Sequence, residues 1–155
     1  MIVKVAEAIK ISKIHRNKGK KIVLAGGCFD IIHLGHIRFL KNAKKLGGVL
    51  FVLLESDDTV GKLKGRNRPI NNQKERAEVL STIKYVDYVV LIKRMKTDKE
   101  YDKLIALLKP DFLAATEGDP GISHKMRQAK LTEAKVRTVT RKLKNKSTTR
   151  LIKNY

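Results

Sequence analysis

Five short runs of branched apolar residues recur along the chain, and their alternation with amphipathic segments constrains the fold most strongly. The runs span residues 21–25, 49–54, 85–92, 112–115 and 135–140. The segments with helical spacing of apolar residues span 37–46, 71–80, 101–108 and 122–129. Because strands separated by helices pair in parallel, we expect an α/β fold with a doubly wound, five-stranded parallel sheet in a single domain, with helices on both faces.

The remaining segments are predicted from their end signals. Val5, Ala8 and Ile9 have helical spacing and Gly19 follows them, so residues 2–17 are expected to form one helix. We therefore divide the chain into a helical N-terminal extension, residues 1–19, and a main domain, residues 20–155. Residues 57–69 show no apolar period and are predicted to be a loop, whereas Ser147 is expected to cap a last helix.

The charge of the chain limits its binding partners. Its 155 residues contain 35 Lys and Arg against 15 Asp and Glu, which gives a formal net charge of +20. Such a charge attracts polyanions, which include nucleic acids, acidic membranes and phosphate-rich small molecules. No apolar run approaches the roughly 20 residues that a membrane span needs. The single cysteine, Cys28, excludes a disulfide framework, and we expect a cytoplasmic protein without a membrane partner.

Polar clusters follow four of the five expected strands. They span residues 26–36, 57–68, 116–119 and 142–150. In a doubly wound sheet, ligands bind at the carboxyl ends of the strands, where the strand order reverses. The four clusters are therefore expected to meet at one edge of the sheet and to form a binding site there.

The first cluster has the chemistry of a phosphate site. A strand leads into a glycine-containing turn and then into a helix, with His33 and His36 on either side of Gly35. A helix N-terminus presents free backbone N–H groups and the positive end of the helix dipole, which favour phosphate. Two imidazoles at that end can donate hydrogen bonds to phosphate oxygens, and Gly35 lets a bulky group approach the backbone.

The stretch Gly27-Cys-Phe-Asp-Ile-Ile-His-Leu-Gly-His36 resembles the signature of the cytidylyltransferase-like nucleotidyltransferases, the superfamily with the His-x-Gly-His motif. Three further matches follow in order: Lys62-Leu-Lys64 resembles the family's Lys-x-Lys loop, Arg76 the arginine of the next helix, and Ser147-Thr-Thr-Arg150 its Ser-Thr-Thr motif. The resemblance implies a Rossmann-like fold, with residues 20–155 as the nucleotidyltransferase domain.

The resemblance also implies transfer of a nucleoside monophosphate to a phosphorylated acceptor, with release of pyrophosphate. It implies Mg²⁺ or another divalent cation with the nucleoside triphosphate, and no covalent intermediate. The catalytic residues it implies are His33, His36, Lys62, Lys64 and Arg76. The nucleotide-binding residues it implies are Gly26, Gly27, Cys28, Phe29, Asp30, Gly35, Thr116, Gly118, Asp119, Ser147, Thr148 and Thr149. The acceptor-binding residues it implies are Asp57 and Arg68. The metal ligands stay open: the triphosphate is expected to hold most of the metal's coordination, and Asp30 is either a further ligand or a residue that closes the turn.

Within the superfamily, residues 64–71 and 19–23 are most similar to the adenylyltransferase domain of bifunctional ADP-heptose synthases. That domain transfers AMP to a sugar 1-phosphate, so ATP is favoured over CTP. The sequence Thr116-Glu-Gly-Asp-Pro120 departs from the Lys-Gly-Gly-Asp-Tyr of those proteins. Archaeal FAD synthetases, which adenylate FMN, and glycerol-3-phosphate cytidylyltransferases are also similar and stay open as alternatives.

A rival interpretation from another class is a basic nucleic-acid-binding or regulatory protein built on a degenerate nucleotidyltransferase scaffold. The +20 charge supports it. Such a protein has no need to keep every polar cluster at the same sheet edge, so nucleic acid is not the favoured partner, although the charge leaves it open. The favoured partners are a nucleoside triphosphate and a phosphorylated small molecule. A homodimer is a further prediction.

Overall fold

The computed structural model describes residues 1–141, and residues 142–155 lie outside the described part. Within residues 1–141 the chain forms one sheet of six strands, all parallel to their neighbours, in the order β1-β4-β3-β2-β5-β6. The strands are β1 (Ile2–Lys4), β2 (Lys21–Gly27), β3 (Gly48–Leu54), β4 (Tyr88–Leu91), β5 (Phe112–Thr116) and β6 (Lys135–Thr140). The helices are α1 (Val5–Asn17), α2 (Leu34–Lys44), α3 (Asp57–Lys64), α4 (Gln73–Ser81), α5 (Asp98–Leu108) and α6 (Ile122–Thr132).

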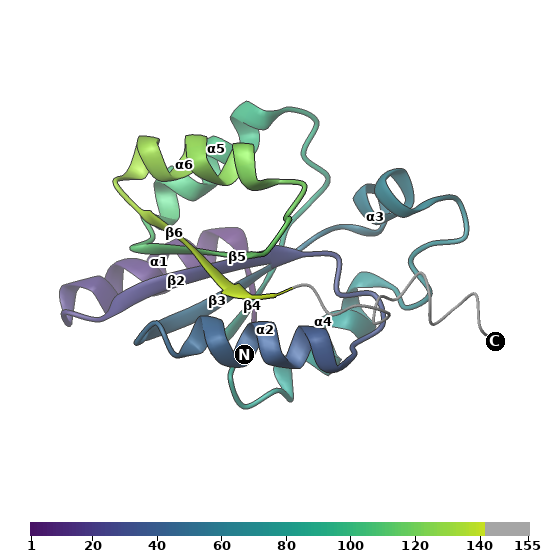
Figure 1. The fold of residues 1–155 in the computed structure, drawn as a ribbon, viewed down its shortest axis with the longest axis horizontal. Coiled ribbons are helices and arrows are strands. Elements are labelled where there is room, and N and C mark those ends of the chain that lie inside the picture. Colours follow the sequence, from purple (N-terminus) through teal and green to yellow (C-terminus); the bar gives the residue numbers. More distant parts are fainter. Residues whose placement is uncertain (142–155) are drawn as a thin grey trace.

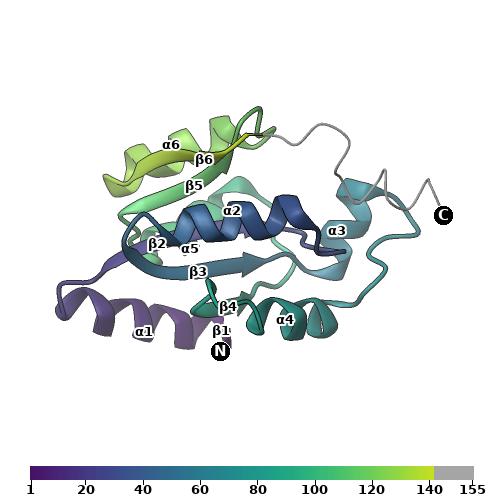
Figure 2. The same cartoon turned by 60° about the horizontal axis from the view of Figure 1, so that its bottom comes forward.

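Helices cover both faces of the sheet, as expected for a doubly wound α/β fold (Figure 1). Helices α1, α5 and α6 pack on one face, and α2 and α4 pack on the other. Figure 2 shows α2 in front of β2 and β3. From β2 the chain passes through α2 and α4 to β3 and β4 on one side of β2. It then passes through α5 and α6, on the opposite face of the sheet, to β5 and β6 on the other side of β2. The strand order therefore reverses between β2 and β5. A ligand crevice is expected at this reversal.

The central strands β2 and β3 account for the continuous apolar runs in the sequence. Strands β2 and β3 pair along their whole length, from Lys21 opposite Gly48 to Gly27 opposite Leu54. Side chains alternate between the two faces of a strand. Along β3, Phe51 and Leu53 therefore enter the core under α1, α5 and α6, whereas Val52 enters the core under α2 and α4. Burial on both faces produces the continuous apolar runs of the sequence.

The predicted fold class is confirmed, but the strand count is six rather than five. The expected helix of residues 2–17 begins only at Val5, because Ile2–Lys4 pairs in parallel with β4 at the edge of the sheet. Val3 is buried in the same core as α5, and Ala8 of α1 joins it there. A three-residue strand is too short to show an alternating pattern, so the sequence gives it no separate signal.

The segment 57–69 is not a loop throughout, because Asp57–Lys64 forms the helix α3. The Ser56 side chain caps the helix by accepting a hydrogen bond from the Thr59 N–H, and Asp57 lies in its first turn. Val60 is the one buried side chain of α3, so the helix shows no apolar period. Asn72 caps α4 in a capping box with Glu75.

Among residues 1–141, no helix combines the length and the hydropathy that crossing a membrane requires. The helix expected after Ser147 lies outside the described residues.

Candidate active site

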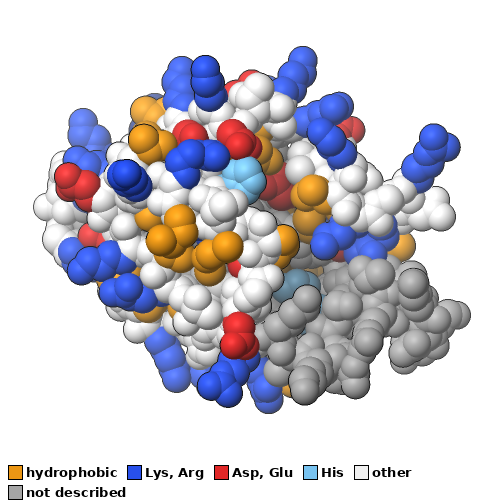
Figure 3. Space-filling view, turned by 45° about the horizontal axis from the view of Figure 1, so that its top comes forward, with side chains coloured by type: hydrophobic (Ala, Val, Ile, Leu, Met, Phe, Trp, Pro, Cys, Tyr) orange, Lys and Arg blue, Asp and Glu red, His pale blue; other side chains and the backbone are white. Residues whose placement is uncertain are grey.

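A cavity of about 780 Å³ opens at the carboxyl edge of the sheet. Its floor is made by the ends of β2, β3 and β5, and its walls come from α3, α5 and α6 and from the loop between β2 and α2. Figure 3 shows the hollow in this face of the molecule, with histidine, acidic and hydrophobic side chains around it. The cavity therefore lies where the reversal of strand order predicts a ligand.

The histidine motif borders this cavity at the start of α2. His33 is the N-cap residue, and its Nδ1 accepts a hydrogen bond of 3.1 Å from the Gly35 N–H. The rings of His33 and His36 stack, with centroids 3.9 Å apart and planes 22° apart. Both rings line the cavity. The two imidazoles are thus held side by side at a helix N-terminus, where a phosphate group is stabilised.

His36 is a neutral imidazole at neutral pH. Burial lowers its pKa from the ordinary value of 6.5 to about 4, and the neighbouring His33 lowers the pKa in the same direction. The Phe29 ring packs 5.2 Å from it, centroid to centroid. A neutral imidazole has one N–H donor, and a hydrogen bond with the Ile31 backbone acts in the opposite direction and raises the pKa of His36.

The lowered pKa of His36 makes the stability of the fold depend on pH. The unfolded chain takes up this proton near pH 6.5 and the folded chain only near pH 4, so acid favours the unfolded state. We expect the contribution to be fully present above pH 6.5 and to be lost as the pH falls toward 4. Urea unfolding at a series of pH values should show a smaller acid loss for His36→Gln than for the native chain.

Asn17→Gln, at an exposed position at the end of α1, is the control for this measurement, since neither side chain titrates. It should keep the acid dependence of the native chain. If His36→Gln and the native chain lose the same free energy of unfolding between pH 7 and pH 5, His36 is not responsible.

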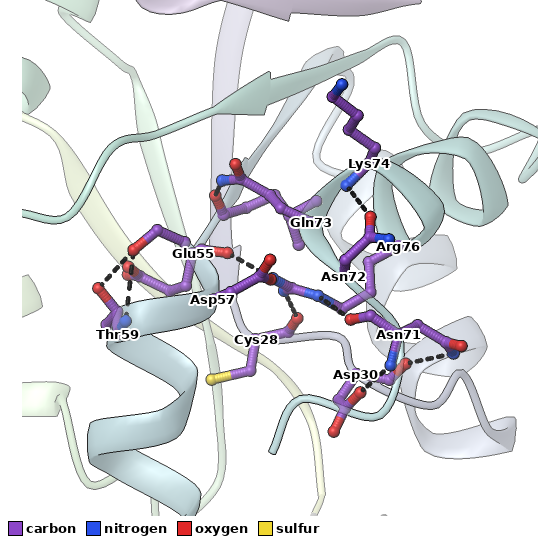
Figure 4. A network of polar contacts seen from close by, with 12 residues as sticks. Cys28, Asp30, Glu55, Asp57, Thr59, Asn71, Asn72, Gln73, Lys74 and Arg76 are labelled. Atoms are coloured by element: carbon purple, nitrogen blue, oxygen red, sulfur yellow. Dashed lines mark hydrogen bonds and ion pairs between the residues drawn. The ribbon is translucent and has the colours of Figure 1, made fainter. Parts of the chain in front are cut away.

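Beneath the cavity, Arg76 ties together three segments of the chain (Figure 4). Its guanidinium donates to the carbonyl oxygens of Cys28, Glu55 at 2.9 Å and Asn71 at 3.0 Å. It also pairs with the Asp57 carboxylate at 2.7 Å. The Arg76 side chain is 0% exposed. Arg76 therefore does not line the cavity, and its hydrogen bonds hold the histidine loop and the end of β3 together.

Asp30 and Arg68 form a second polar cluster at the cavity wall. One carboxylate oxygen of Asp30 accepts hydrogen bonds from the N–H groups of Ile70, at 2.8 Å, and Asn71, at 3.2 Å. The other accepts from the Arg68 guanidinium. These bonds fix the Asp30 carboxylate against residues 68–71 and so hold the loop between β2 and α2 in place. Within residues 1–141, no group of three or more His, Cys, Asp or Glu side chains is placed to hold a metal ion.

The structure brings most of the predicted nucleotide and catalytic residues together. The predicted residues that line the cavity are Gly26, Gly27, Cys28, Phe29, Asp30, His33, His36, Lys64, Arg68 and Asp119. Those in the described part of the chain that do not line it are Gly35, Asp57, Lys62, Arg76, Thr116 and Gly118. Ser147, Thr148 and Thr149 lie outside the described residues.

Asp119 has a structural reason for its position. Its carboxylate accepts from the Gly121 N–H at 2.8 Å and pairs with Lys125 at 2.9 Å, at the start of α6. Gly118, just before it, has a φ of +67°, a conformation that favours glycine. The turn after β5 is therefore fixed beside the cavity even though Thr116 and Gly118 do not line it.

Several residues that line the cavity were not among the site residues predicted from the sequence. Those with polar or charged side chains are Glu55 just after β3, Asp98 and Tyr101 on α5, and His124, Lys125 and Gln128 on α6. The residues of α5 and α6 carry no motif, and only the fold brings them to the cavity. Glu55 did have a signal, because it continues the alternation of Phe51 and Leu53 and so faces a core side of the sheet.

Known proteins resemble this chain in sequence and in fold. The protein named Bifunctional protein HldE from a Nitratiruptor species is 50% identical over 103 residues, which cover 66% of this chain and 21% of that protein. Bifunctional protein HldE from Aliarcobacter butzleri is 48% identical over 102 residues, with 66% and 20% covered. The matching region of this chain thus spans about one fifth of the length of these relatives.

Two solved structures share the fold. The lipopolysaccharide core biosynthesis protein from Thermoplasma volcanium is 30% identical with a TM-score of 0.62, and the match covers 83% of this chain and 100% of that one. The pantoate-beta-alanine ligase from Francisella tularensis is 16% identical with a TM-score of 0.65, covering 93% and 68%, and so shows the fold alone.

The family follows from the motif, from its place in the fold and from a match over most of the chain. The cytidylyltransferase-like family model matches residues 24–154, which include the histidine motif, the Lys-x-Lys segment and all strands from β3 onward. This chain belongs to the cytidylyltransferase-like family.

Proposed function

We propose that this protein is a nucleotidyltransferase that transfers AMP from ATP to a sugar 1-phosphate and releases pyrophosphate. The observation that carries the proposal is the stacked pair of His33 and His36 at the N-terminus of α2, facing a cavity that Lys64 and Arg68 also line. The family match and the HldE relatives support it.

The geometry suits a direct displacement. The acceptor phosphate attacks the α-phosphorus in line while pyrophosphate leaves, so no protein nucleophile is needed. Catalysis then depends on alignment of the reactants and on neutralising the charge that builds up on the transferring and leaving phosphates. His33 and His36 donate hydrogen bonds to these phosphates, and Lys64, with Lys62 beside it on α3, supplies positive charge.

Two lines of support favour a sugar phosphate as acceptor. Segments 19–23 and 64–71 resemble the adenylyltransferase domain of ADP-heptose synthases, and the relatives at about half identity are HldE proteins. The relative from Thermoplasma volcanium is described as a lipopolysaccharide core biosynthesis protein. These similarities favour ATP and a sugar phosphate over CTP with glycerol 3-phosphate and over ATP with FMN.

Other parts of the proposal rest on the family resemblance alone. Mg²⁺ would be carried by the triphosphate and would neutralise its charge, with Ser147, Thr148 and Thr149 as donors to the same phosphates. Gly26, Gly27 and Phe29 would pack against the nucleotide. A homodimer and a cytoplasmic location stay predictions.

The test is pyrophosphate release from a matrix of substrates. ATP, CTP and GTP are each combined with heptose 1-phosphate, mannose 1-phosphate, glycerol 3-phosphate and FMN, in the presence of Mg²⁺. We expect turnover with ATP and a sugar 1-phosphate. Turnover only with CTP and glycerol 3-phosphate, or only with ATP and FMN, would replace the proposed substrates. No turnover with any pair, together with RNA binding that falls steeply with salt, would favour the non-enzymatic interpretation.

A further inference from the structure

The cavity has two chemically different halves. The half at the start of α2 carries His33, His36 and the cationic side chains of Lys64 and Arg68. The half between the end of β3 and the helix α5 has an apolar floor that includes Leu53, Ile92 and Ile105. At that floor lie the carboxylate of Glu55 and the phenol of Tyr101, whereas the second carboxylate on this side, Asp98 at the start of α5, pairs with Arg127 and His124 of α6. No phosphate role accounts for this second half.

The structure fixes Glu55 from its backbone. It follows β3 directly, and its place in the alternation after Phe51 and Leu53 puts it at the end of a row of core-facing side chains. Its N–H donates to the Gly27 carbonyl at 3.2 Å, and its carbonyl accepts from Arg76 at 2.9 Å. The carboxylate therefore projects from a rigid point at a position where an apolar residue would continue the core.

Tyr101 holds the carboxylate in place. Its hydroxyl donates to Glu55 Oε2 at 2.9 Å. Burial raises the pKa of Glu55, whereas the hydrogen bond from Tyr101 and the charge of Arg76 act in the opposite direction. Burial also raises the pKa of Tyr101, so its hydroxyl stays a donor at neutral pH. A carboxylate accepts several hydrogen bonds, so Glu55 can still accept from a bound molecule.

We propose that Glu55, oriented by Tyr101, binds hydroxyl groups on the uncharged part of the acceptor and selects a polyhydroxylated acceptor such as a sugar phosphate. The inference rests on the proposed function and assigns a specificity-determining residue and a positioning residue to it. A carboxylate repels phosphate, so the acceptor phosphate lies toward His33 and Lys64, and its sugar ring lies over Glu55. The apolar floor then packs against the C–H groups of the ring.

The nucleotide base is assigned to the other side of β2. The strand order reverses between β2 and β5, and the turn that holds Asp119 borders the cavity there. Glu55 and Tyr101 lie across β2 from that turn, beside β3 and α5. A base at one side and an acceptor at the other place the two reacting phosphates together in the middle, next to the histidines.

Steady-state kinetics with two acceptors test this assignment. ATP is paired with heptose 1-phosphate, which carries hydroxyls, and with methyl phosphate, which carries none, for the native chain and for Glu55→Gln and Tyr101→Phe. We expect Glu55→Gln to raise the KM for heptose 1-phosphate by about 10- to 100-fold, the range for hydrogen bonds to a charged group. Tyr101→Phe should raise the same KM by roughly 3- to 10-fold, because it loosens the carboxylate without removing it.

The KM for ATP, the kcat at saturating heptose 1-phosphate and the rate with methyl phosphate should stay within about twofold of the native values, because these quantities do not depend on acceptor hydroxyls. Glu78→Gln, at an exposed position on α4, is the matched control and should change none of them. Melting temperatures of all variants show that each is folded.

The outcomes separate this inference from the proposed function. If the native chain releases pyrophosphate from ATP and heptose 1-phosphate but both variants keep its KM, the assignment of Glu55 is wrong and the function stands. A rise in the KM for ATP instead would place the base at Glu55, and an equal loss with methyl phosphate would show a general effect; either result overturns the inference. If the native chain transfers nothing to any sugar phosphate, the proposed function fails, and this inference fails with it.

Discussion

Replacement of His36 by alanine is expected to lower kcat by about 100-fold or more. His36 lines the cavity, and its ring is stacked against His33 at 3.9 Å, so it is already placed for a phosphate before substrate binds. A preorganised donor to charge that develops in the transition state is worth roughly 3 kcal/mol of barrier. Pyrophosphate release with ATP and a sugar 1-phosphate measures the loss. The KM for the acceptor should change far less than kcat.

His15→Ala is the matched control for this experiment. His15 lies on α1, where its Nε2 is 3.1 Å from the Tyr88 hydroxyl, and it does not line the cavity. Its removal should leave kcat per folded molecule near the native value. If His36→Ala turns over as fast as His15→Ala, the phosphates bind elsewhere and the proposed site is misplaced.

The sequence alone predicted the layers of the fold because its strands are buried on both faces. Runs such as residues 49–54 are short and rich in branched residues, which favours a strand buried on both faces, and β3 occupies almost the same residues, Gly48–Leu54. The edge strand β1 and the helix α3 could not be predicted, since one is three residues long and the other buries a single side chain. Short elements acquire their structure from neighbours rather than from a period of their own.

One part of the candidate site could be predicted from the sequence and the other part could not. The half from Gly26 to His36 was predicted because it is contiguous in sequence. There the end of a strand, a glycine-containing turn and the start of a helix follow one another within one motif. In the other half, Glu55 and Tyr101 are 46 residues apart, and the residues of α6 come from a third segment of the chain. No local pattern links such positions, and only the packing of α5 and α6 against the sheet brings them together.

Arg76 shows how a motif position can be predicted from the sequence while the burial of its side chain is not. The resemblance assigned it to substrate, but the structure buries the side chain completely and uses its donors on three carbonyl oxygens and on Asp57. Arginine suits this task because its planar guanidinium presents five N–H donors in fixed directions. What the position requires is therefore the shape of the group as well as its charge.

Replacement of Arg76 by alanine is accordingly expected to lower the free energy of unfolding by about 3–5 kcal/mol. The variant leaves the carbonyl groups of Cys28, Glu55 and Asn71 without their donor and leaves Asp57 without its partner. Arg76→Lys should fall between the alanine variant and the native chain, because a single ammonium group cannot reach all three carbonyls at once. Urea unfolding at pH 7 measures the differences.

Arg94→Ala provides the comparison, since Arg94 is exposed on the segment after β4 and its loss should change the free energy of unfolding by about 0.5 kcal/mol or less. The same variants separate a positioning role from a substrate contact. A positioning residue joins the histidine loop to the end of β3, so Arg76→Lys should weaken the binding of ATP and of the acceptor together. An Arg76→Ala chain as stable as Arg94→Ala would show that the buried network contributes little to the fold. An Arg76→Lys chain of native stability that lost affinity for ATP alone would return Arg76 to the nucleotide site.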